Sequence, residues 1–387
     1  MDISYIINQL GEDPERYFGA VSPPVVQTSN FCFATVSELR KAFTDEQQTY
    51  LYTRGNNPTT EILRKKLAAL AGAEDCLVFS SGAAAVSAAV MHGLKQGDHI
   101  ICVERPYSWT RKLMADYLPR FGVHTTFVDG RHIENFEKAL QPNTRLIYLE
   151  SPNSFTFELQ DLAAVSKLAK QHAVRTILDN SYCTSLGQKA IDLGIDVEVH
   201  SGTKYYGGFS DVVCGIAIGS KQTISGMFTE EFQGLGGILG PHESWLILRS
   251  LRTLPVRMKQ IRENTEAVVA FLRHHPLVDS VLYPFSDDFP QYALAKKQMD
   301  WCGGLFSVYF KETEGEKIES FCNALQRFRM AVSWGGHESL IMPAISFYPE
   351  GAAMHPPHTT GLIRFYIGLE DPDCLIEDIR QALSIMG

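Results

Sequence analysis

The chain has 387 residues, of which 45% are hydrophobic and 20% charged, a composition typical of globular rather than disordered or fibrous proteins. Lys and Arg number 35 against 44 Asp and Glu, and the net charge of −9 argues against nucleic acid as a partner. No apolar run approaches the roughly 18 residues of a membrane helix and the N-terminus lacks a signal-peptide pattern, so we expect a cytoplasmic protein with no membrane partner.

Residues 1–55 show no strong periodicity and include the turn-rich stretch SPPVVQTSNF, so we expect an extended N-terminal arm. From residue 56 to about 240, helical and apolar stretches alternate. A helix is predicted over 61–70, and short apolar runs predict strands at 76–80, 99–103, 123–128, 145–149, 174–179 and 212–219. Such runs are typical of strands covered on both faces, which predicts a large α/β domain with a mostly parallel sheet.

After about residue 240 the sequence pattern changes from alternating short stretches to longer helical ones. Helices are predicted within 244–273, a strand at 305–310, and a last helix that Asp371 caps with Pro372 in its first turn. We therefore expect a smaller α/β domain over 241–387. The eight cysteines include no CxxC pair and several lie in apolar runs, so we expect reduced core thiols.

The main candidates for chemistry are Asp179 and Lys204. Asp179 ends a predicted strand, where open α/β sheets present ligand-binding groups. Lys204 follows Ser201 and Thr203 in the segment HSGTKYYGG, a small polar setting suited to a lysine that forms a Schiff base beside a phosphate.

Pyridoxal phosphate needs a lysine, a carboxylate for its ring nitrogen, donors for its phosphate and an aromatic face. The segment FSSGAAAV passes from a predicted strand into a helix, so the amides of Gly82 and Ala83 would point at an anion. Taken singly, each piece has an ordinary explanation as a helix cap, a turn or a solvated lysine. Their joint presence favours this cofactor.

Eight motifs then make the sequence recognisable: YTRGNNPT, FSSGAAAV, ESPNSFTFE, LDNSY, HSGTKYYGGFSDVV, LRSLRTLPVRM, VSWGGHESL and LIRFYIGLED. From about residue 29 to the end, the chain resembles the pyridoxal-phosphate enzymes of Cys/Met metabolism, which include the cystathionine lyases and synthases and methionine γ-lyase. The resemblance implies the fold type I PLP-dependent transferase-like fold and pyridoxal 5'-phosphate as cofactor.

Residue by residue, the resemblance makes Lys204 the lysine that bonds to the cofactor aldehyde, Asp179 the partner of the ring nitrogen and Tyr107 the stacking tyrosine that exchanges protons with substrate. The cofactor phosphate would meet Gly82, Ala83, Ser201 and Thr203, with Tyr52 and Arg54 supplied by the neighbouring subunit. The substrate amino acid would be held by Arg364, Ser333, Trp334, Ser154 and Tyr52. The site would therefore require a homodimer, and relatives commonly form tetramers.

Within the family, Trp334 and Ser154 favour bacterial cystathionine β-lyases, and Val332 stands where many γ-enzymes carry glutamate. We therefore predict a carbon–sulfur lyase that converts cystathionine or a related amino acid to thiol, pyruvate and ammonia by α,β-elimination. The alternative is γ-elimination or γ-replacement, as in cystathionine γ-synthase, cystathionine γ-lyase or methionine γ-lyase. A non-catalytic relative is a third hypothesis, which the intact lysine, aspartate and arginine argue against.

Several positions depart from the family pattern. Phe209 replaces a common histidine, and we expect Trp109, Arg111, His337 and Val332 to set the substrate, although His337 is equally well a loop histidine without a role. No metal site is predicted, because the paired histidines at 274–275 and 355–358 have no acidic or cysteine partners at ligand spacing.

Overall fold

The computed structural model describes residues 1–312, 314–349 and 352–386. Its larger sheet has seven strands in the order β1-β7-β6-β5-β4-β2-β3. These are β1 (Asp75–Phe79), β2 (His99–Val103), β3 (His124–Val128), β4 (Thr144–Glu150), β5 (Arg175–Asp179), β6 (Val197–Ser201) and β7 (Gly215–Gly219). Strand β7 runs antiparallel to both neighbours, and the other pairs are parallel.

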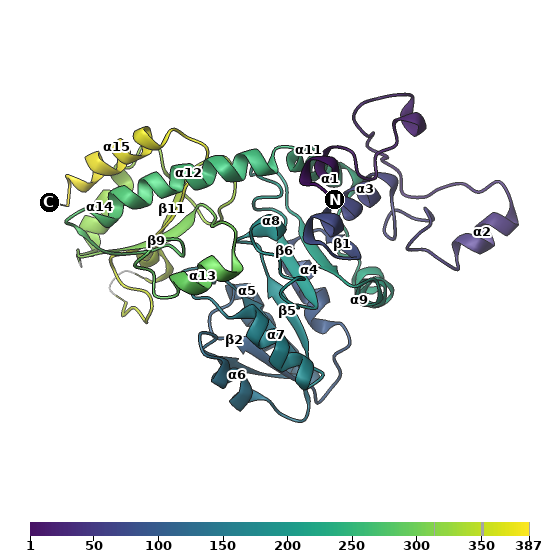
Figure 1. Ribbon diagram of the computed structural model, residues 1–387, viewed down its shortest axis with the longest axis horizontal. Coiled ribbons are helices and arrows are strands. Elements are labelled where there is room, and N and C mark those ends of the chain that lie inside the picture. Colours follow the sequence, from purple (N-terminus) through teal and green to yellow (C-terminus); the bar gives the residue numbers. More distant parts are fainter. Residues whose placement is uncertain (313, 350–351, 387) are drawn as a thin grey trace.

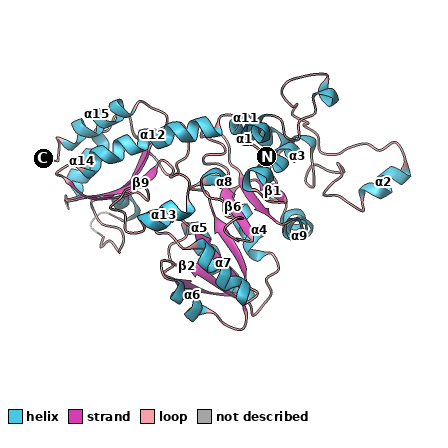
Figure 2. Ribbon diagram, viewed as in Figure 1, coloured by secondary structure: helices cyan, strands magenta, loops and turns pink. Residues whose placement is uncertain are grey.

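Helices connect these strands and cover the sheet, as parallel pairing requires (Figure 2). They are α3 (Pro58–Ala71), α4 (Gly82–Met91), α5 (Ser108–Lys112), η2 (Leu113–Tyr117), η3 (Leu118–Phe121), α6 (Ile133–Ala139), α7 (Leu162–Gln171), α8 (Thr184–Gly187), α9 (Lys221–Met227), η4 (Phe228–Phe232) and α10 (Gln233–Leu235). Helix α3 begins after the capping side chain of Asn57 and ends at Gly72, whose φ of 71° suits glycine.

The predicted strands of this sheet are present, with one missed. Strand β6 was not predicted because Glu198 and His200 interrupt its valines and remove the apolar run. Both side chains are nevertheless fully buried, and they lie 2.8 Å apart as an ion pair. Glu198 Oε1 also accepts hydrogen bonds from Asn180 and Ser185, so tertiary partners offset part of the cost of burying these polar side chains, although Glu198 Oε2 and His200 Nδ1 have no partner among the described residues.

The second sheet has five strands in the order β10-β11-β12-β9-β8, antiparallel except for the β10–β11 pair. Its elements are β8 (Val278–Leu282), β9 (Leu305–Phe310), β10 (Arg329–Met330), β11 (Leu340–Pro343), η5 (Ala344–Phe347) and β12 (Leu362–Tyr366), with α11 (Pro241–Leu251), α12 (Leu254–Arg273), α13 (Tyr292–Gln298), α14 (Gly315–Ala324) and α15 (Pro372–Leu383). Helix α12 runs from the larger part of the molecule across to this sheet (Figure 1). The predicted fold class, a mostly parallel sheet in a large domain with a smaller α/β domain, is confirmed.

The N-terminal residues form two different structures. Helix α1 (Ile3–Asn8) packs on α3, because Lys66 of α3 donates to the carbonyls of Ile6 and Ile7 and pairs with Glu12 at 3.0 Å. The chain then leaves the body, and both η1 (Pro14–Tyr17) and α2 (Val36–Ala42) lie on projecting loops away from the two sheets (Figure 1). The extended segment thus begins later than the first residue.

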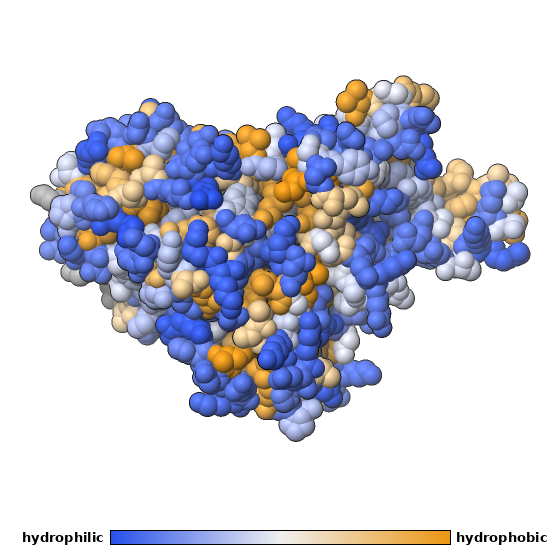
Figure 3. Space-filling view, viewed as in Figure 1, coloured by the Kyte–Doolittle hydropathy of each residue, from blue (hydrophilic) through white to orange (hydrophobic). Residues whose placement is uncertain are grey.

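The projecting segment exposes apolar side chains, namely Phe18, Val21, Val36 and Phe43. Apolar atoms lie among polar ones on it in Figure 3. All eight cysteine thiols of the protein are free, and six of them are buried. Within the described residues, no helix combines the length and apolar character needed to cross a membrane.

Candidate active site

The site begins at the carboxyl end of β5, a predicted strand, and at the carboxyl end of β6, which was not predicted. Asp179 is the last residue of β5, and its Oδ1 accepts hydrogen bonds from the Ser181 amide at 3.0 Å and the Ser181 hydroxyl at 2.6 Å. Burial raises the pKa of Asp179, while the serine bonds lower it. The result is an oriented carboxylate at the sheet edge, which can accept a hydrogen bond from a protonated ring nitrogen.

Lys204 lies in the turn that follows β6. Its Nζ donates to Ser333 Oγ at 2.5 Å and lies 5.6 Å from the centre of the Trp334 ring. Burial, and secondarily the positive charge of Arg364, lower the pKa of Lys204 to about 8. Roughly one lysine in ten is therefore neutral at pH 7, which is the form that acts as nucleophile or base.

A loop from the smaller sheet places Ser333 against this lysine. Ser333 itself has a φ of 82°, a conformation that costs a non-glycine residue energy and is found most often at functional sites. Gly335 has a φ of 90°, and a Cβ there would lie 2.8 Å from Lys204 Cα and Cβ. The loop can approach the lysine backbone only because this residue is glycine.

Arg364 on β12 supplies a buried cation. Only 6% of the residue is exposed, and its hydrogen bonds are long, at 3.4 Å to the carbonyls of Ser154 and Ser333. No carboxylate pairs with it among the described residues, and its guanidinium lies 4.9 Å from the centre of the Phe155 ring. Burial lowers the pKa of Arg364 to about 10. A buried cation that has neither a counter-ion nor close hydrogen bonds can accept an anion as its partner.

The predicted phosphate-binding residues meet where α4 begins. Ser81 caps α4 through its hydroxyl, and a Cβ on Gly82 would lie 3.0 Å from Ser201 Cα and Cβ. The start of α4 and the end of β6 thus approach each other closely. A side chain at residue 82 would fill the space in front of their amide and hydroxyl donors, and glycine leaves that space to a phosphate. Thr203 contributes less, because its hydroxyl already bonds the Cys214 backbone.

A buried glutamate in this region was not predicted. Glu150 ends β4, pairs in register with Asp179 on β5, and accepts hydrogen bonds from the Tyr107 amide at 2.6 Å and the Ser154 hydroxyl at 2.7 Å. Burial and the neighbouring Asp179 raise the pKa of Glu150 to about 8. An acid that ends an apolar strand was the available signal, since the same pattern pointed to Asp179.

Tyr52 and Arg54 lie elsewhere. Arg54 Nε donates to Gln233 Oε1 at 3.0 Å, and no described hydrogen bond or ion pair joins either residue to Lys204 or Asp179. Tyr52 is half exposed, and Arg54 makes no ion pair with any carboxylate in the described part of the chain. Both side chains are thus available to bind groups outside this subunit's own site.

The four residues expected to determine substrate specificity do not share a common set of contacts. Trp109 and Val332 are exposed, at 60% and 75%. Arg111 turns away to lie 4.1 Å from the centre of the Phe127 ring and to bond the carbonyl of Glu104, and His337 pairs with the adjacent Glu338. Arg111 and His337 therefore have structural partners of their own.

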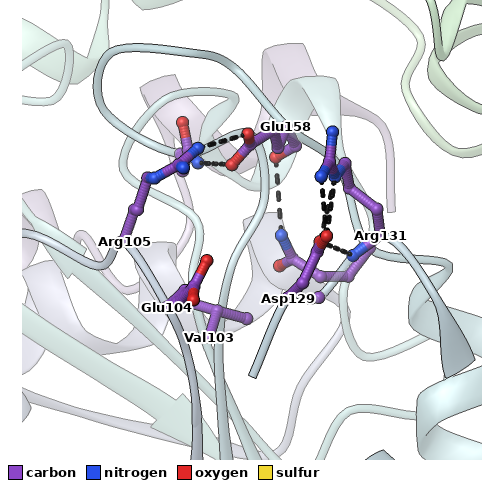
Figure 4. Close-up of a pocket in the computed structure, with 9 residues that line it drawn as sticks. Val103, Glu104, Arg105, Asp129, Arg131 and Glu158 are labelled. Atoms are coloured by element: carbon purple, nitrogen blue, oxygen red, sulfur yellow. Dashed lines mark hydrogen bonds and ion pairs between the residues drawn. The ribbon is translucent and has the colours of Figure 1, made fainter. Parts of the chain in front are cut away.

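A small polar cavity opens near the Tyr107 loop (Figure 4). The ion pairs Arg105–Glu158 and Arg131–Asp129 line it, at 2.7 and 2.6 Å. Its volume of about 10 Å³ holds one water molecule, which could bond the unpartnered Oε1 of Gln160. This cavity is too small for an amino acid.

On another face, His92, Glu230 and Glu231 bring ligand atoms within 4.8 Å of one another, a grouping that sequence spacing could not reveal.

Comparisons with known proteins match this geometry. The family model described as "Cys/Met metabolism PLP-dependent enzyme" covers residues 5–384. The chain belongs to this family. Its cofactor is pyridoxal 5'-phosphate, as predicted, and the arrangement of Lys204, Asp179 and the α4 cradle fits that group.

Relatives within the family carry several activities in their names. An L-methionine gamma-lyase of Treponema denticola is 39% identical over 95% of this chain and 93% of its own. A cystathionine gamma-lyase of Bacillus subtilis is 36% identical, covering 95% of each chain, and a cystathionine beta-lyase MetC of Staphylococcus haemolyticus is 34% identical over 95% of this chain and 91% of its own. A crystal structure of metB from Corynebacterium glutamicum superposes with a TM-score of 0.92 at 33% identity, covering 100% of this chain and 99% of that one. The family prediction is confirmed, and the γ-lyase alternative fits these names at least as well as β-elimination.

Proposed function

We propose that the protein is a carbon–sulfur lyase that splits a sulfur-containing amino acid into a thiol, ammonia and a 2-oxo acid. The observation that carries this proposal is the buried guanidinium of Arg364, which has no anionic partner among the described residues and shares Ser333 with the reactive lysine. An α-carboxylate bound there would place the α-carbon of an amino acid beside Lys204 Nζ. Holding the carboxylate in this way fixes which bond at that carbon is broken.

The residues have separable tasks. Bound pyridoxal phosphate supplies an electron-withdrawing ring that accepts the electrons of the bond broken at the α-carbon. Asp179 would hold the ring nitrogen in its protonated form, and Tyr107 would cover the ring face. Lys204, whose pKa is near 8, would bind the cofactor aldehyde at rest and take the α-proton once the substrate amine replaces it.

Two positions of the leaving thiol are open to this machinery. Elimination from the β-carbon of cystathionine gives homocysteine and pyruvate, and Trp334 favours it. Elimination from the γ-carbon of methionine gives methanethiol and 2-oxobutanoate, and the names of the methionine and cystathionine γ-lyase relatives favour it. For γ-elimination Lys204 must also take a proton from the β-carbon, so the same lysine serves both reactions.

The proposal is tested with purified holoenzyme. Lys204→Ala should abolish turnover and the visible absorbance of lysine-bound cofactor together, whereas Lys221→Ala, which removes an exposed lysine, should change neither. Wild-type product analysis then separates pyruvate from 2-oxobutanoate. Unchanged turnover by Lys204→Ala would remove that lysine from its assigned role, and absence of any 2-oxo acid from sulfur amino acids would refute the lyase proposal.

We also propose that the site is completed by a second copy of the chain. The support is that no carboxylate among the described residues of their own subunit pairs with Tyr52 or Arg54, and that Tyr52 forms a β-bridge with Asn30 of the projecting segment. A guanidinium fork binds phosphate bidentately. Mixing the inactive variants Lys204→Ala and Arg54→Gln under subunit exchange should restore activity, because one site of each mixed dimer has both residues. No recovery in verified mixed dimers would contradict this assembly of the site.

A further inference from the structure

The carboxyl group of Glu150 is buried without a cation. Only 6% of the residue is exposed, and no described lysine, arginine or histidine pairs with it. A buried acid of this kind is costly and needs hydrogen bonds to be tolerated. The Tyr107 amide and the Ser154 hydroxyl donate to different oxygens of Glu150, and the Ser154 backbone adds a further hydrogen bond.

Those two bonds lead to two different loops of the site. Oε2 accepts the Tyr107 amide, in the segment after β2, and Oε1 bonds the Ser154 hydroxyl, in the segment after β4. Tyr107 is 45% exposed, and no other described residue holds its side chain by a hydrogen bond. Ser154, in turn, offers its backbone carbonyl to Arg364.

The position of Glu150 in the sheet fixes where these two hydrogen bonds lie relative to Asp179. It is the register partner of Asp179, so its Cα is anchored on the strand beside the one that carries the ring-binding carboxylate. A displacement of Tyr107 or Ser154 relative to Asp179 therefore has to stretch a short bond to Glu150.

We propose that Glu150 is a positioning residue of the reaction: it ties the loop of Tyr107 and the loop of Ser154 to the end of β4, and so sets the tyrosine over the cofactor ring and Arg364 against the substrate carboxylate. The proposal rests on the proposed function, since it takes Tyr107 and Arg364 as groups that meet cofactor and substrate. It adds a residue that touches neither.

The test compares Glu150→Ala, Glu150→Gln and Ser154→Ala in the holoenzyme, with Glu104→Gln as the control. Glu104 is an exposed acid in the segment that leads to Tyr107. Glutamine keeps an acceptor oxygen for the Tyr107 amide, whereas alanine removes both bonds. Steady-state kcat and KM, the circular dichroism of the bound cofactor, and hydrogen exchange of the Tyr107 segment without cofactor are measured.

For Glu150→Ala we expect kcat/KM to fall about 100-fold, the size of effect that follows a displacement of about 1 Å in a site. The dichroic band should change, and the Tyr107 segment should exchange faster. Glu150→Gln should recover to within about tenfold of wild type, and Ser154→Ala added to Glu150→Ala should cost little more, because the serine acts through the lost carboxyl. Glu104→Gln should match wild type in all three measurements.

Equal losses for alanine and glutamine with unchanged exchange and dichroism would overturn the positioning role, as would additive effects of Ser154→Ala. Poor folding of Glu150→Ala leaves the isosteric glutamine variant and the Ser154→Ala kinetics to decide. A wild-type protein that binds no pyridoxal phosphate would instead refute the proposed function, while a loaded, active wild type with unaffected Glu150 variants refutes only this inference.

Discussion

Replacing Arg364 with methionine should remove substrate binding without weakening the fold. Its guanidinium is buried, and a pKa of about 10 instead of the usual 12.5 means that the folded protein disfavours the charged form. The difference of about 2.5 pKa units corresponds to about 3 kcal/mol, which the protein loses at any pH below 10 because the group stays charged there. Methionine fills a similar volume without charge.

The contacts that Arg364→Met removes are worth less than the charge penalty that it relieves. The hydrogen bonds of Arg364 are long, and the contact with Phe155 contributes about 1 kcal/mol. We therefore expect Arg364→Met to leave the free energy of unfolding unchanged or to raise it by about 1–2 kcal/mol. For the substrate, losing the partner of a buried carboxylate costs about 2 kcal/mol or more, which is about a 30-fold or larger fall in kcat/KM.

Arg257 provides the matched control. It is 5% exposed, and burial likewise lowers its pKa to about 10. Its hydrogen bonds are shorter than those of Arg364. It donates to the carbonyls of Tyr205 and Ser250 at 2.9 and 3.2 Å, and so holds the turn after Lys204. Arg257→Met removes a similar charge penalty, but it also removes the donor to the Tyr205 carbonyl, whereas the Ser250 carbonyl keeps its bonds from Thr253. We therefore expect its free energy of unfolding to lie about 1–3 kcal/mol below that of Arg364→Met.

Urea unfolding of the cofactor-free proteins at pH 8 gives the stabilities, and kcat/KM of the loaded enzymes gives substrate binding. If Arg364→Met destabilises as much as Arg257→Met, the guanidinium is a structural group and the assignment of an anion site from its isolation is wrong. A stable variant with wild-type kcat/KM would refute the carboxylate-binding role by itself.

Three further outcomes follow from the same structure. Gly335→Ala should destabilise by about 2 kcal/mol or more and weaken cofactor absorbance, because its φ of 90° and a Cβ 2.8 Å from Lys204 both oppose a side chain; normal stability by urea unfolding would contradict this. Burial raises the pKa of Glu150 to about 8, so the free energy of unfolding of the wild type carries no penalty below pH 4.5 and falls as pH rises towards 8. Relative to the wild type, the cofactor-free Glu150→Gln variant should therefore gain about 4 kcal/mol in free energy of unfolding between pH 5 and 9. Parallel pH profiles of the two proteins would exclude this. Glu12→Gln leaves the fully buried Lys66 without its carboxylate and should cost about 3–5 kcal/mol in urea unfolding, a loss that Glu15→Gln on the exposed surface should not show.

The sequence determined much of the larger sheet. Residues 99–103 and 145–149 are short apolar runs, and such runs form strands wherever both faces are covered, whatever their partners. Asp179 could be found because it ends a predicted strand, and Lys204 because it lies among small polar residues in HSGTKYYGG; the resemblance then assigned their chemistry. Strand β6 could not be found, because its glutamate and histidine become acceptable only through partners that other segments supply.

Tertiary structure alone decided how these groups are charged and held. Nothing local shows that Arg364 has no counter-ion within the described part of the chain, that Glu150 bonds two loops, or that Arg54 bonds Gln233. Sequence pattern records which side chains a segment turns inward, since that depends on the period of a helix or strand. The pKa of a group and the strength of its bonds depend on burial and on neighbours that lie far away along the chain, and only folding brings those together.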